Sequence, residues 1–235
     1  MTQFTTQPCD FDGGLGQTAR IGLIVLQSDQ TLEHDFTQLF SGDGVVIHHA
    51  RIPNAMEVTP ESLRDMARDL PDAAALLPKQ FGFDAIAYAC TSGATMIGES
   101  AVAELVQRHH PDVQVTNPLT AAKAAMEALG IKKLALLTPY TADVTEGLQT
   151  AFADIGITTT AVASFDQSDD FKVARITSGS ILNAILNMDT SDCDAIFISC
   201  TSLRTLPIIE AAEKATGKPV LSSNQTLAWH LGQIT

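Results

Sequence analysis

The chain has 235 residues, of which 45% are hydrophobic and 17% are charged, and its formal net charge is −13 at pH 7. This length suits one large domain or two similar lobes, each with its own core. The excess of acidic residues repels phosphate backbones and anionic membranes, so we expect neither nucleic acid nor membrane partners.

No apolar run approaches the ~20 residues of a membrane-spanning helix, and the N-terminus lacks a basic region followed by an apolar core. We therefore expect a cytoplasmic protein. The four cysteines, Cys9, Cys90, Cys193 and Cys200, form no Cys-x-x-Cys pair and have no His cluster near them. Neither a metal site nor a disulfide framework is expected from this spacing.

The first half of the chain alternates strand and helix patterns. Residues 1–19 are polar and rich in glycine, which predicts a flexible N-terminal arm. Apolar runs and helical periodicity then predict the elements in order. They are a strand at 21–26, a helix at 32–40, a strand at 45–50, a helix opening at Pro60, a second helix at 72–77, a strand ending at Cys90, a helix at 94–109 and a strand at 113–116.

The second half repeats this alternation. Its predicted elements are a strand at 133–138, a helix at 144–155, a strand at 157–163, a helix at 178–187, a strand ending near Cys200, a helix at 207–215, a strand at 219–222 and a helix at 226–232. Strands that alternate with helices at this spacing favour parallel sheets covered by helices.

One stretch occurs twice. Asp84-Ala-Ile-Ala-Tyr-Ala-Cys-Thr-Ser92 returns as Asp194-Ala-Ile-Phe-Ile-Ser-Cys-Thr-Ser202, and Asn117 and Asn224 follow the two copies at similar distances. A duplicated α/β unit is the simplest explanation. We predict two lobes related by a pseudo-twofold axis, residues 20–117 and 118–235, each a four-stranded, mostly parallel sheet flanked by helices. Whether the terminal helices exchange between the lobes stays open.

The repeated motif predicts the position of a site. Ligands of parallel α/β sheets bind beyond the carboxyl ends of the strands, where Cys90 and Cys200 both fall. A thiol before a helix N-terminus is favoured as thiolate, and two thiols on opposite sides of one carbon can exchange its proton without a cofactor. Backbone amides around Ser92 and Ser202 can bind a carboxylate. Cys9 and Cys193 are not followed by Thr-Ser, and we expect them to have no catalytic role.

The paired Cys-Thr-Ser motifs, together with Leu137-Thr-Pro-Tyr140, resemble the aspartate/glutamate racemase superfamily, in its branch of maleate cis-trans isomerases, arylmalonate decarboxylases and ectoine-utilisation proteins. The resemblance spans about residues 19–235. Within this branch, Val25-Leu-Gln-Ser-Asp-Gln-Thr-Leu-Glu33, Cys200-Thr-Ser-Leu-Arg-Thr-Leu206 and Ser222-Ser-Asn-Gln225 look most similar to the ectoine-utilisation members.

The resemblance implies roles for particular residues. Cys90 matches the cysteine that adds to the double bond in maleate isomerases, and Cys200 matches the cysteine that donates or removes a proton. Tyr140 matches a tyrosine that hydrogen-bonds a substrate carboxylate. Further positions match those that hold the carboxylates, namely Thr91, Ser92 and Thr201.

Three departures from the relatives concern the substrate. Maleate isomerases carry Asn where this chain has Asp29, arylmalonate decarboxylases carry glycine where it has Cys90, and aspartate and glutamate racemases tend to have Cys-Thr-Glu where it has Cys-Thr-Ser202. Asp29 is either a turn or helix-capping residue or the partner of a substrate ammonium group. Arg175 is a further candidate for binding a carboxylate, against the alternative of a surface ion pair.

These observations favour a cofactor-independent racemase or isomerase of a small carboxylate, such as an amino acid from ectoine breakdown. Two alternatives stay open: maleate cis-trans isomerisation by covalent cysteine addition, and a two-lobed protein that binds a metabolite without converting it. We expect the protein to form a homo-oligomer and to bind a small carboxylate as its substrate.

Overall fold

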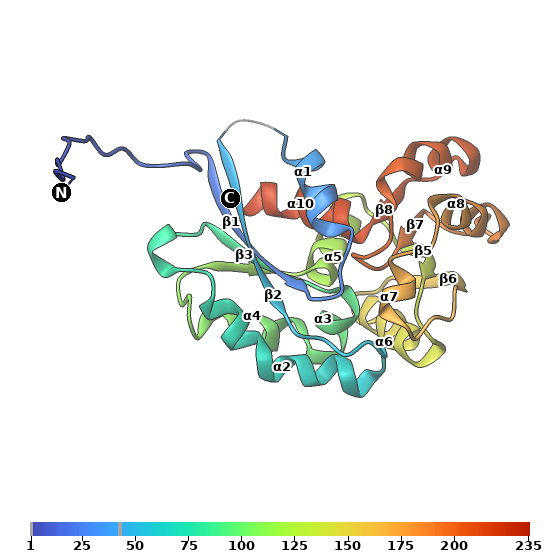
Figure 1. The fold of residues 1–235 in the computed structure, drawn as a ribbon. Coiled ribbons are helices and arrows are strands. Elements are labelled where there is room, and N and C mark those ends of the chain that lie inside the picture. The colour runs from blue at the N-terminus through green and yellow to red at the C-terminus, as the bar shows by residue number, and fades with distance from the viewer. Residues whose placement is uncertain (1, 42–43) are drawn as a thin grey trace.

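The computed structural model describes residues 2–41 and 44–235, which form two lobes, each built on a four-stranded sheet (Figure 1). The first sheet has the strand order β2-β1-β3-β4 and the second has the order β6-β5-β7-β8. All strand pairs in both sheets are parallel. The strands are β1 (Ala19–Leu26), β2 (Val45–Ile52), β3 (Ala85–Ala89), β4 (Gln114–Thr116), β5 (Lys133–Thr138), β6 (Thr158–Ser164), β7 (Ala195–Ile198) and β8 (Val220–Ser222).

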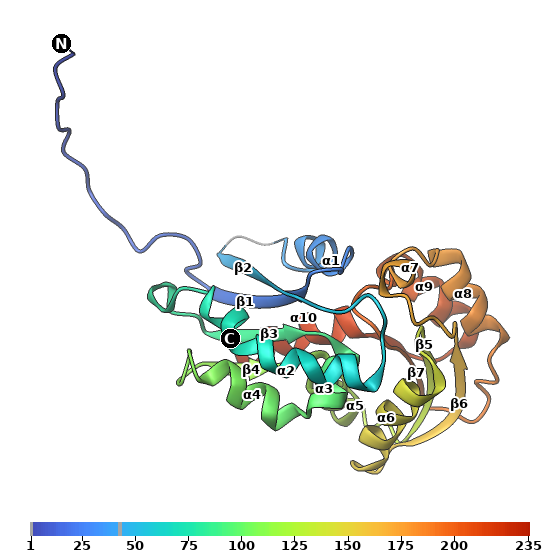
Figure 2. The same ribbon diagram turned by 60° about the horizontal axis from the view of Figure 1, so that its bottom comes forward.

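Helices connect the strands and cover both sheets (Figures 1 and 2). They are α1 (Leu32–Leu39), α2 (Pro60–Ala75), α3 (Thr91–Ile97), α4 (Glu99–Gln107), α5 (Pro118–Ala128), α6 (Ala142–Ala153), α7 (Asp170–Val173), α8 (Ser178–Asn187), α9 (Ile209–Thr216) and α10 (Ser223–Ile234). Short 3₁₀ turns at Lys79–Phe81 and Leu206–Ile208 complete the described elements.

The two sheets have the same strand order, so the duplication predicted from the repeated motif is confirmed at the level of topology. In each lobe the two central strands are the most apolar. Every residue of β3 and β7 is buried, because these strands have a neighbour on each side and helices over both faces. The carboxyl ends of β3 and β7 therefore lie in the middle of the sheet of their own lobe, away from its outer strands.

The last helix, α10, follows the second sheet but packs on the first. Leu227 and Leu231 belong to the apolar cluster that contains Ile21 and Leu23 of β1, together with Ala121 of α5. Both ribbon views show α10 lying between α1 and α5, with the C-terminus in the first lobe (Figures 1 and 2). Because α10 follows a strand of the second sheet and packs on the first sheet, its first residues lie between the two lobes.

Two helix boundaries differ from the sequence prediction. The helices expected at Pro60 and at 72–77 are one continuous helix, α2, with Pro71 inside it. Burial of Leu70 and Ala74 on its apolar face outweighs the hydrogen bond that proline removes. The helix expected at 94–109 is instead two helices, α3 and α4, separated by Gly98 at φ 96°, a conformation that glycine adopts readily.

The N-terminal arm extends away from the body of the molecule (Figures 1 and 2). Phe4 and Phe11 are 91% and 92% exposed. Arg20 holds the base of the arm by donating to the backbone oxygens of Gly13 and Leu15. The flexibility expected for residues 1–19 stays a prediction, and Met1 lies outside the described residues.

Candidate active site

Cys90 and Cys200 lie at the carboxyl ends of equivalent strands. Cys90 directly follows β3 and is the N-cap residue of α3, where its Sγ accepts a hydrogen bond from the Gly93 backbone N–H at 3.2 Å. Cys200 follows β7 after one intervening residue, Ser199, and begins a turn. Both cysteines line the same cavity between the lobes, so the two copies of the motif form one site.

The cavity is small. Its volume is about 20 Å³, which is room for about one water molecule. The first lobe contributes Leu26, Asn54, Ala55, Val58, Ser62, Leu63, Met66, Cys90, Thr91 and Ser92, and the second contributes Tyr140, Asp170, Cys200, Thr201 and Ser202. Since any four-carbon acid is several times larger than water, a substrate must push these walls apart to bind.

One wall is a backbone strap that joins the lobes. Glu57 and Asp169 form an isolated antiparallel bridge. The Val58 N–H donates to the Ser168 carbonyl at 2.7 Å, and the Asp170 N–H donates to the Met56 carbonyl at 2.9 Å. These bonds hold the segment after β2 against the segment before α7, which closes the cavity on this side.

Tyr140, which lies two residues after the end of β5, lines the cavity together with both thiols. The side chain is buried, and burial together with the nearby Cys200 and Cys90 raises the pKa of the phenol well above its usual value. The phenol therefore stays protonated at neutral pH. A neutral phenol in the wall of this cavity can donate a hydrogen bond to a substrate carboxylate.

Burial raises the pKa of both thiols. The pKa of Cys90 rises to about 11, although the hydrogen bonds from the Gly93 amide and from Ser92 oppose the shift. Burial is also the main cause that raises the pKa of Cys200, and the negative charge of nearby Asp170 adds to the increase. In this closed arrangement both sulfurs are thiols, and neither is the reactive thiolate.

The threonines of the two motifs bridge the lobes. Thr91 Oγ1 lies 2.8 Å from Ser223 Oγ, and Thr201 Oγ1 donates to the Ala89 carbonyl at 3.3 Å. Ser223 Oγ also accepts the Cys200 backbone N–H at 3.0 Å. Both threonines line the cavity, as expected from the resemblance, but their hydroxyls are engaged with the opposite lobe.

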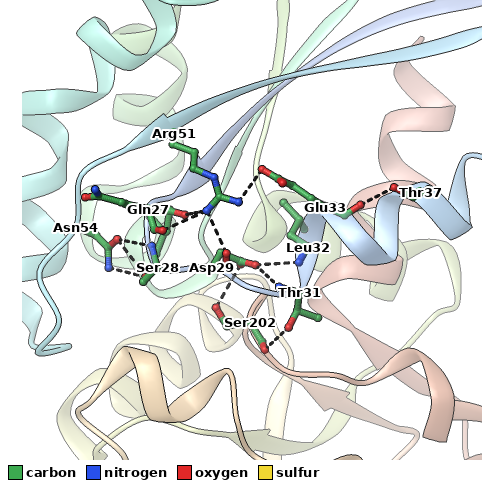
Figure 3. A network of polar contacts seen from close by, with 11 residues as sticks. Gln27, Ser28, Asp29, Thr31, Leu32, Glu33, Thr37, Arg51, Asn54 and Ser202 are labelled. Atoms are coloured by element: carbon green, nitrogen blue, oxygen red, sulfur yellow. Dashed lines mark hydrogen bonds and ion pairs between the residues drawn. The ribbon is translucent and has the colours of Figure 1, made fainter.

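The serines of the motifs are arranged differently from each other. Ser92 Oγ lies 3.7 Å from the Cys90 Sγ, beside the sulfur itself. Ser202 Oγ donates instead to Asp29 Oδ2 at 3.3 Å (Figure 3). The two motifs therefore make unequal halves of the site.

Asp29 is a turn residue ahead of α1, whose N-cap residue is Thr31. Its Oδ1 accepts the backbone N–H groups of Thr31 and Leu32 at 2.8 and 2.9 Å, at the start of α1 (Figure 3). Its Oδ2 is engaged by Ser202, and Asp29 is not among the residues that line the cavity. Of the two interpretations offered by the sequence, these contacts agree with the turn residue, and Asp29 is absent from the cavity lining.

Arg175 and the two remaining cysteines lie away from the cavity. The Arg175 side chain is exposed, with its guanidinium 4.1 Å from the centre of the Phe171 ring. Cys9 is in the exposed arm, and Cys193 is buried with its thiol directed to the Thr190 carbonyl. The structure therefore does not bring Arg175 together with the other predicted site residues.

Among the residues near the two sulfurs, Asp170 and Tyr88 were not predicted from the sequence. Asp170 lines the cavity opposite the first lobe, although it is distant from both motifs in the sequence. Tyr88 lies beneath Cys90, and a Cβ atom at Gly93 would lie 2.3 Å from the Tyr88 hydroxyl and 3.0 Å from Cys90 Sγ. The two-residue spacing of Tyr88 and Cys90 on one strand was an available signal for the tyrosine. Nothing local indicated Asp170.

Across residues 2–41 and 44–235, no group of three or more His, Cys, Asp or Glu side chains is arranged to hold a metal ion. None of the helices within these ranges combines the length and apolar character needed to cross a membrane.

Two parallel α/β lobes that each bring one cysteine to a shared closed cavity define the class of protein. The chain matches the arylmalonate decarboxylase (Amdase) family over residues 21–234, and it belongs to that family. The resemblance inferred from the Cys-Thr-Ser motifs is confirmed by this match and by the relatives described next.

Maleate isomerases are prominent among the relatives. That of Nocardia farcinica is 30% identical over 223 residues, which cover 87% of this chain and 85% of the relative. That of Geobacillus stearothermophilus is 27% identical over 219 residues, covering 87% and 86%. A mutant of the Nocardia farcinica maleate cis-trans isomerase, solved with a covalently bound succinylcysteine intermediate, has a TM-score of 0.84 and 27% identity over 92% of each chain.

Proposed function

We propose that this chain is a cofactor-independent isomerase or racemase of a small carboxylate, with Cys90 and Cys200 as its two reacting groups. The observation that supports this most directly is that the cysteines of both motifs line one small cavity together with Tyr140. Burial of both sulfurs keeps bulk water away from a carbanion or a covalent intermediate.

The reaction needs one sulfur as thiolate and the other as thiol. In racemisation, the thiolate removes the proton from the carbon next to the carboxylate, and the opposite thiol donates its proton to the other face. The proton count is unchanged, with the two sulfurs exchanging roles. Tyr140 donates a hydrogen bond to the carboxylate, which stabilises the negative charge that develops on it.

Cis-trans isomerisation of maleate is the second candidate, and the maleate isomerase relatives favour it. The Cys90 thiolate would add to one alkene carbon while Cys200 protonates the other. Rotation about the resulting single bond, return of the proton to Cys200 and breakage of the C–S bond would release the trans acid. The covalent succinylcysteine in the Nocardia farcinica neighbour is the kind of intermediate that this route forms.

An amino acid from ectoine breakdown is one candidate substrate. We include it because the motifs around Asp29 and Ser222 resemble those of ectoine-utilisation proteins. Decarboxylation of arylmalonates is not proposed, because Cys90 stands where those decarboxylases have glycine. A metabolite-binding role without chemistry is the remaining alternative, and it requires both cysteines to be dispensable.

Deuterium exchange tests the proposed function. In deuterated water, we expect the protein to exchange the proton on the carbon next to the carboxylate of its substrate. The exchange is measured by NMR for a panel of amino acids and small diacids. Cys90→Ala and Cys200→Ala should each lower the rate by about 10²-fold or more, the usual range for a lost acid or base. Cys193→Ala is the matched control, since this buried cysteine lies outside the cavity.

Two results separate the alternatives. A mass increase of one substrate molecule on Cys90 after addition of maleate would favour the covalent route over proton exchange. Undiminished conversion by the Cys90→Ala, Cys200→Ala double mutant would remove the two-cysteine mechanism. Tight binding by that double mutant, without conversion by the parent, would favour the non-catalytic role.

A further inference from the structure

Asp170 presents a buried carboxyl group to the same cavity. It is the first residue of α7, which Asp169 caps by accepting the N–H groups of Phe171 and Lys172. Asp170 is only 6% exposed and lines the cavity together with both thiols. Its backbone N–H is held by the Met56 carbonyl in the strap between the lobes, so its position is fixed by cross-lobe contacts.

Two neutral side chains orient the carboxyl group. Asp170 Oδ2 accepts a hydrogen bond from Ser28 Oγ and another from Asn54 Nδ2 at 3.1 Å. Ser28 and Asn54 also bond to each other, which fixes both donors (Figure 3). Oδ1 receives no hydrogen bond from any residue that the structure describes. One oxygen is thus held in place while the other is left for a ligand.

No basic side chain balances this acid. Within residues 2–41 and 44–235, none of the ion pairs includes Asp170, and no Lys, Arg or His lines the cavity. Burial and the nearby Asp29 raise the pKa of Asp170, and Asp170 in turn raises the pKa of Cys90 and Cys200. A buried carboxylate without a positive partner is costly, so the site favours a ligand that supplies one.

We propose that Asp170 is the binding site for a cationic group of the substrate, which is therefore a zwitterion carrying a carboxylate and an ammonium group rather than a dicarboxylate. This inference rests on the proposed function, because it identifies the substrate class of the same cavity. A second carboxylate in the position of the ammonium would face Asp170 with no basic side chain to offset the repulsion. The ammonium also screens Asp170 from the sulfurs, which eases formation of the thiolate.

Binding of two matched probes tests this inference. Succinate and β-alanine share a two-carbon spacer and one carboxylate, and they differ in carrying a second carboxylate or an ammonium group. We expect wild-type protein to prefer β-alanine, and Asp170→Asn to shift the ratio of the two dissociation constants at least tenfold towards succinate. The affinities are measured by NMR titration, with thermal unfolding confirming that the variant folds.

The matched control is Asp169→Asn. It removes the same charge one residue away, keeps a side chain that caps helices well, and changes a group that pairs with Lys172 outside the cavity. This variant should keep the wild-type ratio. A tenfold shift in it would show that net charge alone controls the preference and would overturn the assignment to Asp170.

Other binding results would also decide whether Asp170 binds an ammonium group. An unchanged ratio in Asp170→Asn overturns the inference, as does absence of binding of either probe to both proteins. A wild-type preference for succinate, whether or not it survives in Asp170→Asn, also overturns the inference. Since neither probe needs to react, failure of this inference is distinguishable from failure of the cysteine chemistry, which the deuterium exchange experiment tests separately.

Discussion

The two catalytic cysteines of the proposal occupy equivalent chain positions but have different backbone conformations. Cys90 is extended, with φ −143°, whereas Cys200 has φ +119°, in a region that favours glycine. A non-glycine residue in such a conformation costs about 1–3 kcal/mol and persists only where surrounding contacts impose it. The hydrogen bond from the Cys200 N–H to Ser223 is one such contact. Strain at this residue is consistent with a functional role for the sulfur.

At the scale of single residues, the raised pKa of Cys90 predicts how stability depends on pH. Burial raises this pKa from 9.0 to about 11. Between those values the folded chain binds more protons than the unfolded chain, so the free energy of unfolding falls as pH rises. The decrease is at most about 1.4 kcal/mol per pH unit.

The measurement is thermal unfolding across pH 9 to 11, the window set by the shift of Cys90. We expect the midpoint of Cys90→Ser to fall less steeply with pH than that of the wild type, because serine does not titrate there. Cys9→Ser, in the exposed arm, should keep the wild-type slope. Equal slopes for Cys90→Ser and the wild type would contradict a buried thiol at Cys90.

At the scale of elements, α10 has a structural role that its position at the end of the chain does not suggest. Its core residues pack on the first sheet, and its first residue, Ser223, contacts the cysteine motifs of both lobes. Near it, Asn224 donates to Asp35 of α1 and to the Thr201 carbonyl. The start of α10 thereby aligns the two halves of the site.

Ser223→Ala tests this role. The substitution leaves the buried Cys200 N–H and the Thr91 hydroxyl without their partner, so we expect a loss of about 1–3 kcal/mol in stability together with slower turnover. Thr226→Val is the matched control, because the Thr226 hydroxyl bonds only to carbonyls at the start of its own helix. Wild-type turnover in Ser223→Ala would contradict a role in positioning Cys200.

At the scale of the whole molecule, catalysis requires the lobes to separate. The cavity of about 20 Å³ holds about one water molecule, and the strap at Val58 and Asp170 closes it with backbone hydrogen bonds. We expect substrate admission to break these bonds, while the central strands of each sheet stay intact. Separation of the lobes at the strap is therefore the expected motion.

Hydrogen exchange tests this motion. We expect the amides of Val58 and Asp170 to exchange faster than those of the central strand β5, because opening the strap needs no unfolding of a sheet. A bound substrate should slow exchange at the strap and leave β5 unchanged, measured by mass spectrometry on peptides from each segment. Protection of the strap equal to that of β5 without substrate would contradict opening at this position.

Much of the fold followed from local patterns. Apolar runs located the strands, and the strand at 133–138 and the helix at 178–187 agree with β5 and α8. The helix boundaries predicted near Pro71 and Gly98 were wrong, because the effect of these residues depends on burial and on the backbone conformation that neighbouring elements impose. Two lobes with the same strand order followed from one repeated motif, since duplicated sequence folds into duplicated topology.

The site was predictable where residues adjoin the motifs and not elsewhere. Cys90, Cys200 and Tyr140 were expected to converge, and they line one cavity or lie beside its sulfurs. Asp29 and Arg175 were also expected there, yet Asp29 lies in the turn before α1 and Arg175 is exposed. Their residue types suit both surface and site, so type alone could not decide between them.

The sequence by itself determined which residues form strands, which two cysteines correspond and which family the chain resembles, because periodicity and repeated motifs are local properties of the chain. The tertiary structure alone decided that Asp170 meets both thiols, that Ser223 joins the motifs and that a strap closes the cavity. These contacts join residues far apart in sequence, and their formation depends on how the two lobes pack, which no local pattern records.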